Sequence, residues 1–105
     1  MKMEREKIIE RLKEALEKGW AVTIVVRTME HETQEIPLEV TGVQRDASGE
    51  WFNTWEMANE RETGREVVRR TFKGTDRRGN RTEIGDVYLV ENIEDVRRRI
   101  RVGDN

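Results

Sequence analysis

The N-terminal segment has the apolar spacing of an amphipathic helix. In residues 4–18, EREKIIERLKEALEK, apolar side chains recur every three to four positions and form one stripe: Ile8, Ile9, Leu12, Ala15 and Leu16. Gly19 follows, and glycine at this position commonly ends a helix in the left-handed conformation. A single-stripe helix of this length is marginal alone, so we expect it to pack against the rest of the chain.

The remaining chain shows the period-two alternation and the β-branched and aromatic residues that are typical of strands. The segments with this pattern are 20–29, 36–46, 51–57, 66–73 and 82–90. In the first of them, one face carries Trp20, Val22, Ile24 and Val26. Pro37 indicates an edge strand or a strand end, and Gly42 predicts a bulge or a sharp bend.

The end of the chain is predicted to turn before it finishes. NIEDV, 92–96, predicts a helical turn with Asn92 as its N-cap, and RRRIRV, 97–102, either closes the structure as a last strand or extends that turn. Short polar turns between strands favour antiparallel neighbours. We therefore expect an α+β fold, in which an N-terminal helix packs on a strongly bent antiparallel sheet of five or six strands. The prediction is a single domain over 1–105, with the helix in 1–19 and the sheet or barrel in 20–102.

Two segments resemble small SH3/Sm-like barrels, as found in YolD-like and Rof-like proteins. They are VTGVQRD, 40–46, which precedes a hairpin, and VYLVENIEDVRRRI, 87–100; the resemblance extends over 20–57 and 84–102. In such barrels a strand kinks at a glycine, here Gly42, and a late turn, here Ile93 to Ile100, leads into the closing strand. Sm proteins hold uridine with Asp and Asn at a fixed spacing, which Asp46 and Asn53 do not match. The resemblance implies a small barrel that binds and regulates a larger machine, and it implies no uridine site.

Composition narrows the class of protein. The chain has 105 residues, 40% of them charged and 34% hydrophobic, and it has no cysteine, which excludes disulfides and Cys-based zinc sites. Nothing approaches the about 20 apolar residues that a membrane-spanning helix needs, and the charged start MKMEREKIIERLKE is unlike a signal peptide. We expect a cytoplasmic protein with no membrane partner. The net charge of −2 hides an asymmetry, because residues 1–64 hold 9 Lys+Arg against 14 Asp+Glu, and residues 65–101 hold 11 against 7.

Candidates for catalysis are few. The one histidine, His31, lies between Glu30 and Glu32, but consecutive side chains splay apart and no second histidine could complete a zinc site. Neither a nucleophile elbow nor a phosphate-binding loop is present. We expect no enzymatic activity, no cofactor and no metal.

Two same-face tryptophans raise a choice between core and contact surface. Trp51 and Trp55 could form a stacking platform for bases, but in a small domain such residues are more often core, and we predict that both are buried. Phe52 points the opposite way, and an exposed phenylalanine there would mark a contact surface.

The stretch VVRRTFKGTDRRGNRTEIG, 67–85, concentrates basic residues on one predicted hairpin. Its cations surround Phe72 and are Arg69, Arg70, Lys73, Arg77, Arg78 and Arg81. They could protect exposed strand edges, dock an acidic protein surface, or grip phosphate. The net negative charge speaks against a dedicated nucleic-acid binder.

We therefore predict a non-enzymatic protein-binding module. It would act as a small regulator or inhibitor of a larger cytoplasmic or phage–host machine, a role that the resemblance implies. The contact would be Phe52 together with the basic hairpin 69–81, and the partner an acidic protein surface. The alternative is a weak, salt-sensitive RNA- or DNA-binding module that uses the same hairpin, and the oligomeric state stays open.

Overall fold

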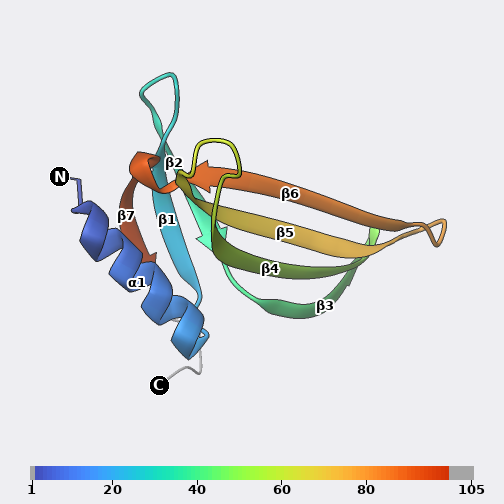
Figure 1. The fold of residues 1–105 in the computed structure, drawn as a ribbon. Helices are drawn as coiled ribbons and strands as arrows, with labels where there is room; N and C mark the ends of the chain where they lie inside the picture. The colour runs from blue at the N-terminus through green and yellow to red at the C-terminus, as the bar shows by residue number, and fades with distance from the viewer. Residues whose placement is uncertain (1, 100–105) are drawn as a thin grey trace.

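The structure is a computed structural model that describes residues 2–99. Over these residues the fold is α+β, with one α-helix and seven strands in two antiparallel sheets (Figure 1). The elements are α1 (Arg5–Lys18), β1 (Val22–Arg27), β2 (Thr33–Leu38), β3 (Thr41–Asp46), β4 (Gly49–Asn59), β5 (Glu66–Asp76), β6 (Arg81–Leu89), the 3₁₀ turn η1 (Val90–Asn92) and β7 (Ile93–Arg98).

The strands form a three-stranded sheet in the order β2-β1-β7 and a four-stranded sheet in the order β3-β4-β5-β6. In residues 2–99 no strand pairing joins the two sheets, so the single bent sheet that we predicted is replaced by two, and barrel closure is not seen. The expected strand 36–46 accounts for the difference. It breaks at Glu39 and Val40, so that β2 pairs with β1 and β3 pairs with β4. Alternation continues across the break, and a hydropathy pattern therefore cannot reveal that the chain changes sheets.

The predicted N-terminal helix is present and packs against the three-stranded sheet (Figure 1). Its stripe buries Ile8, Leu12 and Ala15 completely, whereas Leu16 stays partly exposed. Gly19 ends the helix with φ 70°, the left-handed conformation expected there, and its N–H donates to the Ala15 carbonyl oxygen.

One hydrophobic core includes residues from the helix and both sheets. The strand residues buried in it are Val22, Ile24, Val26, Leu38, Trp55, Val68, Ile93 and Val96. The core residues of β4 and β5, Trp55 and Val68, lie toward one end of the β4–β5 pair. The opposite end of this pair contributes no residue to the core cluster.

Two predictions near the ends of strands have different outcomes. The bulge at Gly42 is confirmed, because the β3–β4 register shifts between Thr41 and Gln44. The helical turn at 92–96 is wrong: the turn η1 comes earlier, and Ile93–Arg98 is β7, since Ile93 and Val96 pair with β1 and are buried in the core. The predicted strand residues 100–102 lie outside the described part of the chain.

Strand length determines where the candidate site lies. β4 and β5 have 11 residues each, which span about 37 Å at roughly 3.4 Å per residue, whereas the 14 residues of α1 span about 21 Å. The four-stranded sheet therefore extends beyond the helix and the other sheet (Figure 1). We call its far part, residues 43–53 and 72–84, the distal arm.

Candidate functional site

The predicted basic hairpin is formed by β5 and β6, which pair without interruption from Val67↔Leu89 to Thr75↔Arg81. Because side chains alternate between the two faces, its residues do not form one patch. The face that carries Phe52, here called the Phe52 face, also carries Arg69, Lys73 and Arg81. Arg70 and Phe72 lie on the opposite face, and Arg77 and Arg78 lie in the turn between the strands.

Arg70 is committed to contacts within the fold. Its guanidinium donates to both carboxylate oxygens of Asp86, at 3.1 and 2.7 Å, and to the Pro37 carbonyl oxygen at 3.2 Å. The Tyr88 hydroxyl donates to the same carboxylate at 3.0 Å, and the Arg70 side chain is only 15% exposed. Arg70 therefore fastens β2 of one sheet to β5 and β6 of the other. Phe72 lies beside it, with the guanidinium carbon 5.1 Å from the ring centre.

The charges of this cluster reinforce one another. Burial alone would raise the pKa of the Asp86 carboxyl, but hydrogen bonds from Arg70 and Tyr88 and the charge of Arg70 outweigh burial, so the pKa is lowered. Burial and the neighbouring carboxylate raise the pKa of the Tyr88 hydroxyl. The hydrogen bond to Asp86 raises the pKa of Arg70, which stays charged.

Arg69 also has a partner, although a weaker one. Its guanidinium lies 3.1 Å from a carboxylate oxygen of Glu56 across the β4–β5 pair. Both side chains are largely exposed, so solvent screens this ion pair and it leaves Arg69 able to exchange partners.

The other four cations of the hairpin have no such partner. Among the described residues, no carboxylate lies within ion-pair distance of Lys73, Arg77, Arg78 or Arg81. Outside the arm, only two cations in residues 2–99 likewise lack an ion pair, a hydrogen bond and an aromatic contact: Lys13 and Arg61. We call these six side chains, which lack all three kinds of contact among the described residues, uncommitted cations. Four of the six lie at one end of the molecule.

The tip turn holds two of these cations on an ordered backbone. The Asp76 carboxylate accepts hydrogen bonds from the N–H groups of Arg78 and Asn80, both at 2.9 Å, and the Asp76 N–H donates to the Asn80 carbonyl oxygen. Gly79 has φ 82°, which glycine adopts without strain. Arg77 and Arg78 are exposed on this turn.

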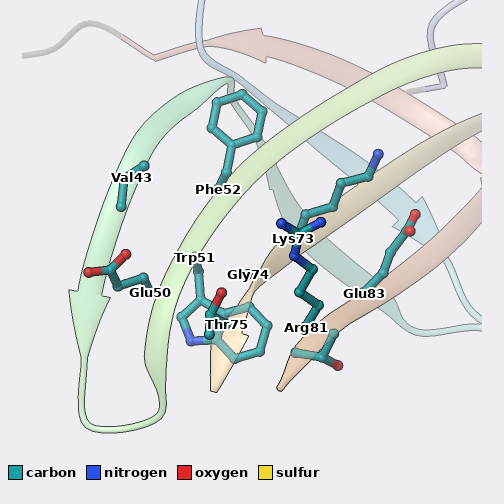
Figure 2. Close-up of a pocket in the computed structure, with 10 residues that line it drawn as sticks. Val43, Glu50, Trp51, Phe52, Lys73, Gly74, Thr75, Arg81 and Glu83 are labelled. Atoms are coloured by element: carbon teal, nitrogen blue, oxygen red, sulfur yellow. The ribbon is translucent and has the colours of Figure 1, made fainter. Parts of the chain in front are cut away.

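Beside the tip, the distal arm encloses a surface hollow of about 600 Å³ (Figure 2). Val43 and Phe52 line it from β3 and β4, and Lys73 and Arg81 line it from β5 and β6. Val43 is 66% exposed and Phe52 is 39% exposed, as predicted for Phe52. The hollow thus presents apolar surface next to an ammonium and a guanidinium group.

Carboxylates also border the hollow and limit its positive potential. Glu50 pairs with Arg45 at 2.8 Å, and Glu83 lies opposite Lys73 in the strand register. The surface of the hollow is therefore mixed in charge: it carries the uncommitted cations Lys73 and Arg81 and also the carboxylates of Glu50 and Glu83.

The two tryptophans have different surroundings. Trp55 is buried with 4% exposure, as predicted, whereas Trp51 is only half-buried: it lies beyond the end of the core and lines the hollow, so its assignment to the core is wrong. Its indole covers Gly74 on the neighbouring strand: a Cβ at Gly74 would lie 2.9 Å from Trp51 Cε3 and would collide with the Glu50 carbonyl oxygen. The Trp51 Nε1–H donates to Ser48 Oγ at 2.8 Å. With Trp55 buried, the two indoles do not form a platform for bases.

Several residues of the hollow escaped the sequence analysis. Val43, Gly74 and Thr75 were not singled out, and Trp51 was assigned to the core. One available signal was Gly74 within a strand pattern, since glycine there often marks the close approach of another group. The other was strand length, which we set too short at 66–73 and 51–57.

The remaining features of the described chain add no second site. His31 lies in the exposed turn between β1 and β2 with φ 62°. In residues 2–99, no cluster of three His, Cys, Asp or Glu side chains is arranged to hold a metal ion. α1 is too short and too polar to cross a bilayer, and no other α-helix occurs in this range. Comparison with protein-family models, curated proteins and solved structures gives no match.

Proposed function

We propose that this chain is a non-enzymatic protein-binding module whose contact is the Phe52 face and tip of the distal arm. One observation carries the proposal: uncommitted cations gather beside exposed apolar side chains on a part of the sheet that no other layer covers. Apolar patches of this kind, edged by polar groups, are typical of protein contact surfaces. The uncommitted cations favour a partner with an acidic surface.

Each group has a defined part in such a contact. Lys73 and Arg81 would meet carboxylates of the partner, while Val43 and Phe52 would be buried against its apolar side chains. Long-range attraction by Arg77 and Arg78 would accelerate encounter, and the buried apolar area would slow dissociation. Arg70 would act only by positioning β5 and β6.

The wider role follows from the resemblance in sequence. A small SH3/Sm-like protein that regulates or inhibits a larger cytoplasmic or phage–host machine fits a chain whose distal arm offers a contact surface. The bulge at Gly42 supports the relationship, since a glycine kink is one of the two features that suggested it. The other feature, a late turn from Ile93 to Ile100, does not support it, because Ile93–Arg98 is the strand β7.

Binding of RNA or DNA is the second candidate, because the same four cations could contact phosphate. The arrangement favours it less. Glu50, Asp76 and Glu83 interrupt the cationic surface, and Phe72 lies on the opposite face from Phe52, so bases would find no continuous row of aromatic rings.

The test compares two double variants with the same change in net charge. Lys73→Gln/Arg81→Gln removes uncommitted cations from the arm, and Lys13→Gln/Arg61→Gln removes them elsewhere. The probes are a 12-residue peptide that alternates Glu with Leu and Phe, and a 12-nucleotide oligothymidylate, each titrated into ¹⁵N-labelled protein. We expect the peptide to shift amide signals around Phe52, and affinity to fall about 3- to 10-fold only in the arm variant.

Salt dependence separates the two candidates. Phosphate contacts release counterions, so affinity for the oligonucleotide would fall with log salt at about 0.7 per contact. We expect no oligonucleotide complex tighter than about 10 μM at physiological salt. A sub-micromolar oligonucleotide complex that the arm variant abolishes would reverse the ranking, and equal losses in both double variants would refute a specific contact on the arm.

A further inference from the structure

We infer that the open edge of β6 pairs with β6 of a second copy of this chain, which joins two four-stranded sheets into one of eight strands. This pairing goes beyond the proposed function: the edge of β6 is separate from the Phe52 face, although both contacts use Arg81 and the tip arginines Arg77 and Arg78. It starts from a comparison of the four outer strands in the described sheets, namely β2, β7, β3 and β6.

Three of these edges carry features that block the addition of a strand. β2 contains Pro37, which lacks an N–H donor. β7 has a register shift opposite Val25 and Val26 and packs against α1, and β3 is bulged between Thr41 and Gln44. Such interruptions are the usual protection of an exposed edge.

β6 has none of these features. Its nine residues pair with β5 without a shift and include no proline. Ile84 and Val87 are 58% and 50% exposed on opposite faces of the strand, so apolar surface is available on both sides of the edge. A long, regular strand with exposed apolar side chains is a favourable template for pairing.

The hairpin geometry shows which backbone groups are available. The Asp76 N–H donates to the Asn80 carbonyl oxygen, so 76 and 80 form a hydrogen-bonded pair. Hydrogen-bonded and non-hydrogen-bonded pairs alternate in an antiparallel ladder, and the even-numbered residues of β6 therefore bond to β5. The N–H and C=O groups of Glu83, Gly85 and Val87 consequently point outward.

One antiparallel register suits a two-fold pair of β6 strands. With Ile84 opposite its own symmetry mate, the two side chains meet at a non-hydrogen-bonded position, where facing side chains are closest. A shift of two residues in one direction would set Glu83 against Glu83, and in the other would set Ile84 against Asp86. In the favoured register the remaining pairs are Thr82 with Asp86, Glu83 with Gly85, and Arg81 with Val87.

Charge at the ends of the strands supports a second copy as the occupant. Antiparallel pairing brings the tip turn of one copy, with Arg77 and Arg78, toward η1 of the other, which carries Glu91. Glu91 is 57% exposed, and within residues 2–99 its one ion pair is with the exposed Arg65, at 3.3 Å, so it can accept a further cation. Arg77 and Arg78 of each copy would therefore lie near Glu91 of the other copy, and two-fold symmetry makes this contact occur twice in each dimer.

The test is the oligomeric state of the full chain and of two matched variants. Sedimentation velocity over about 5–500 μM should show a monomer–dimer equilibrium with a dissociation constant on the order of 100 μM, since a single strand pair is a small interface. Ile84→Lys should weaken dimerisation at least 10-fold, because two lysines would then face each other. Val40→Lys alters a side chain of similar exposure, 56%, away from β6 and should leave the equilibrium unchanged.

Mixing charge variants tests the register itself. Ile84→Lys and Ile84→Glu should each be monomeric alone, and their mixture should form a heterodimer, measured by energy transfer between dyes. Unchanged thermal melting of each variant shows that the fold is intact. A wild-type chain that is monomeric at 500 μM, or a mixture that fails to pair, would overturn the inference. The acidic-peptide titration uses Lys73 and Arg81 variants, so either proposal can fail without the other.

Discussion

Replacing Arg70 with methionine tests whether one ion cluster fastens the two sheets together. Methionine keeps an apolar stem and removes the guanidinium, together with its contact with the Phe72 ring. The loss comprises two charge-assisted hydrogen bonds to Asp86 and one bond to the Pro37 carbonyl oxygen. Charge-assisted bonds contribute about 1.5–3 kcal/mol each when buried, but Asp86 is 39% exposed and solvent screens part of this. We expect Arg70→Met to lower the free energy of unfolding by about 2 kcal/mol.

The neighbouring residue provides a matched control. Arg69→Met removes the same group from the same strand, but it breaks only the exposed pair with Glu56 and should cost about 0.5 kcal/mol or less. Urea denaturation followed by tryptophan fluorescence measures both variants, and a cycle with Asp86→Asn isolates the coupling. Equal effects of the two methionine variants, or additive effects in the cycle, would refute the role of the cluster.

The pH dependence gives an independent check of the same cluster. The pKa of Asp86 is lowered in the folded state, so its contribution is present above the unfolded value near 3.9 and is lost as pH falls through the folded pKa. The difference between wild type and Arg70→Met should therefore shrink below about pH 4. The pKa of Tyr88 is raised, so stability should also fall as the hydroxyl ionises above about pH 10. A difference that stays constant from pH 7 to pH 3 would contradict this assignment.

The remaining predictions separate core from arm by equilibrium unfolding. Trp55→Ala should cost about 3–5 kcal/mol because the indole is buried, whereas Trp51→Ala should cost about 1 kcal/mol; similar costs would contradict the position of Trp51 outside the core. Gly74→Val should destabilise by more than about 2 kcal/mol, since its side chain would collide with the Glu50 backbone, and a neutral result would show that the strands separate freely there. Asp76→Ala should cost about 1 kcal/mol and broaden the amide signals of the tip turn, which sharp signals would disprove.

Local periodicity was enough to predict the helix and the strand segments, because each of these elements buries a face. The apolar stripe of α1 repeats with each turn of the helix, and the alternation of β1 repeats every second residue, so a short stretch of sequence is enough to recognise either element. The division into two sheets depends instead on which strands pair, and the break at Glu39 and Val40 has no strong turn signal. A helical turn was wrongly predicted over 92–96 because Asn92 is a good N-cap by type, whereas the burial of Ile93 and Val96 decides in favour of a strand.

The candidate site was predicted in part for a related reason. Residue type alone identified the cations and Phe52, but not whether each cation already had a partner. Arg69 and Arg70 look alike in sequence, and only the register that sets Arg70 opposite Asp86 separates a fastening residue from an exposed one. Trp51 was assigned to the core because alternation shows which face a side chain occupies and not how far the core extends along that face.

The position of the Arg70 cluster explains why function and stability are separable in this fold. The cluster lies where the core ends. On this face of the sheet, Arg70 pairs with Trp55, between the pair Met57–Val68 on the core side and the pair Asn53–Phe72 on the arm side. Beyond it the arm depends on its own strand ladder, since neither α1 nor the three-stranded sheet reaches it (Figure 1). Charge substitutions at Lys73 and Arg81 should therefore change the free energy of unfolding by less than about 0.5 kcal/mol while they change binding. A large loss of stability in that double variant would mean that these cations support the fold, and the arm would then have no surplus charge to offer a partner.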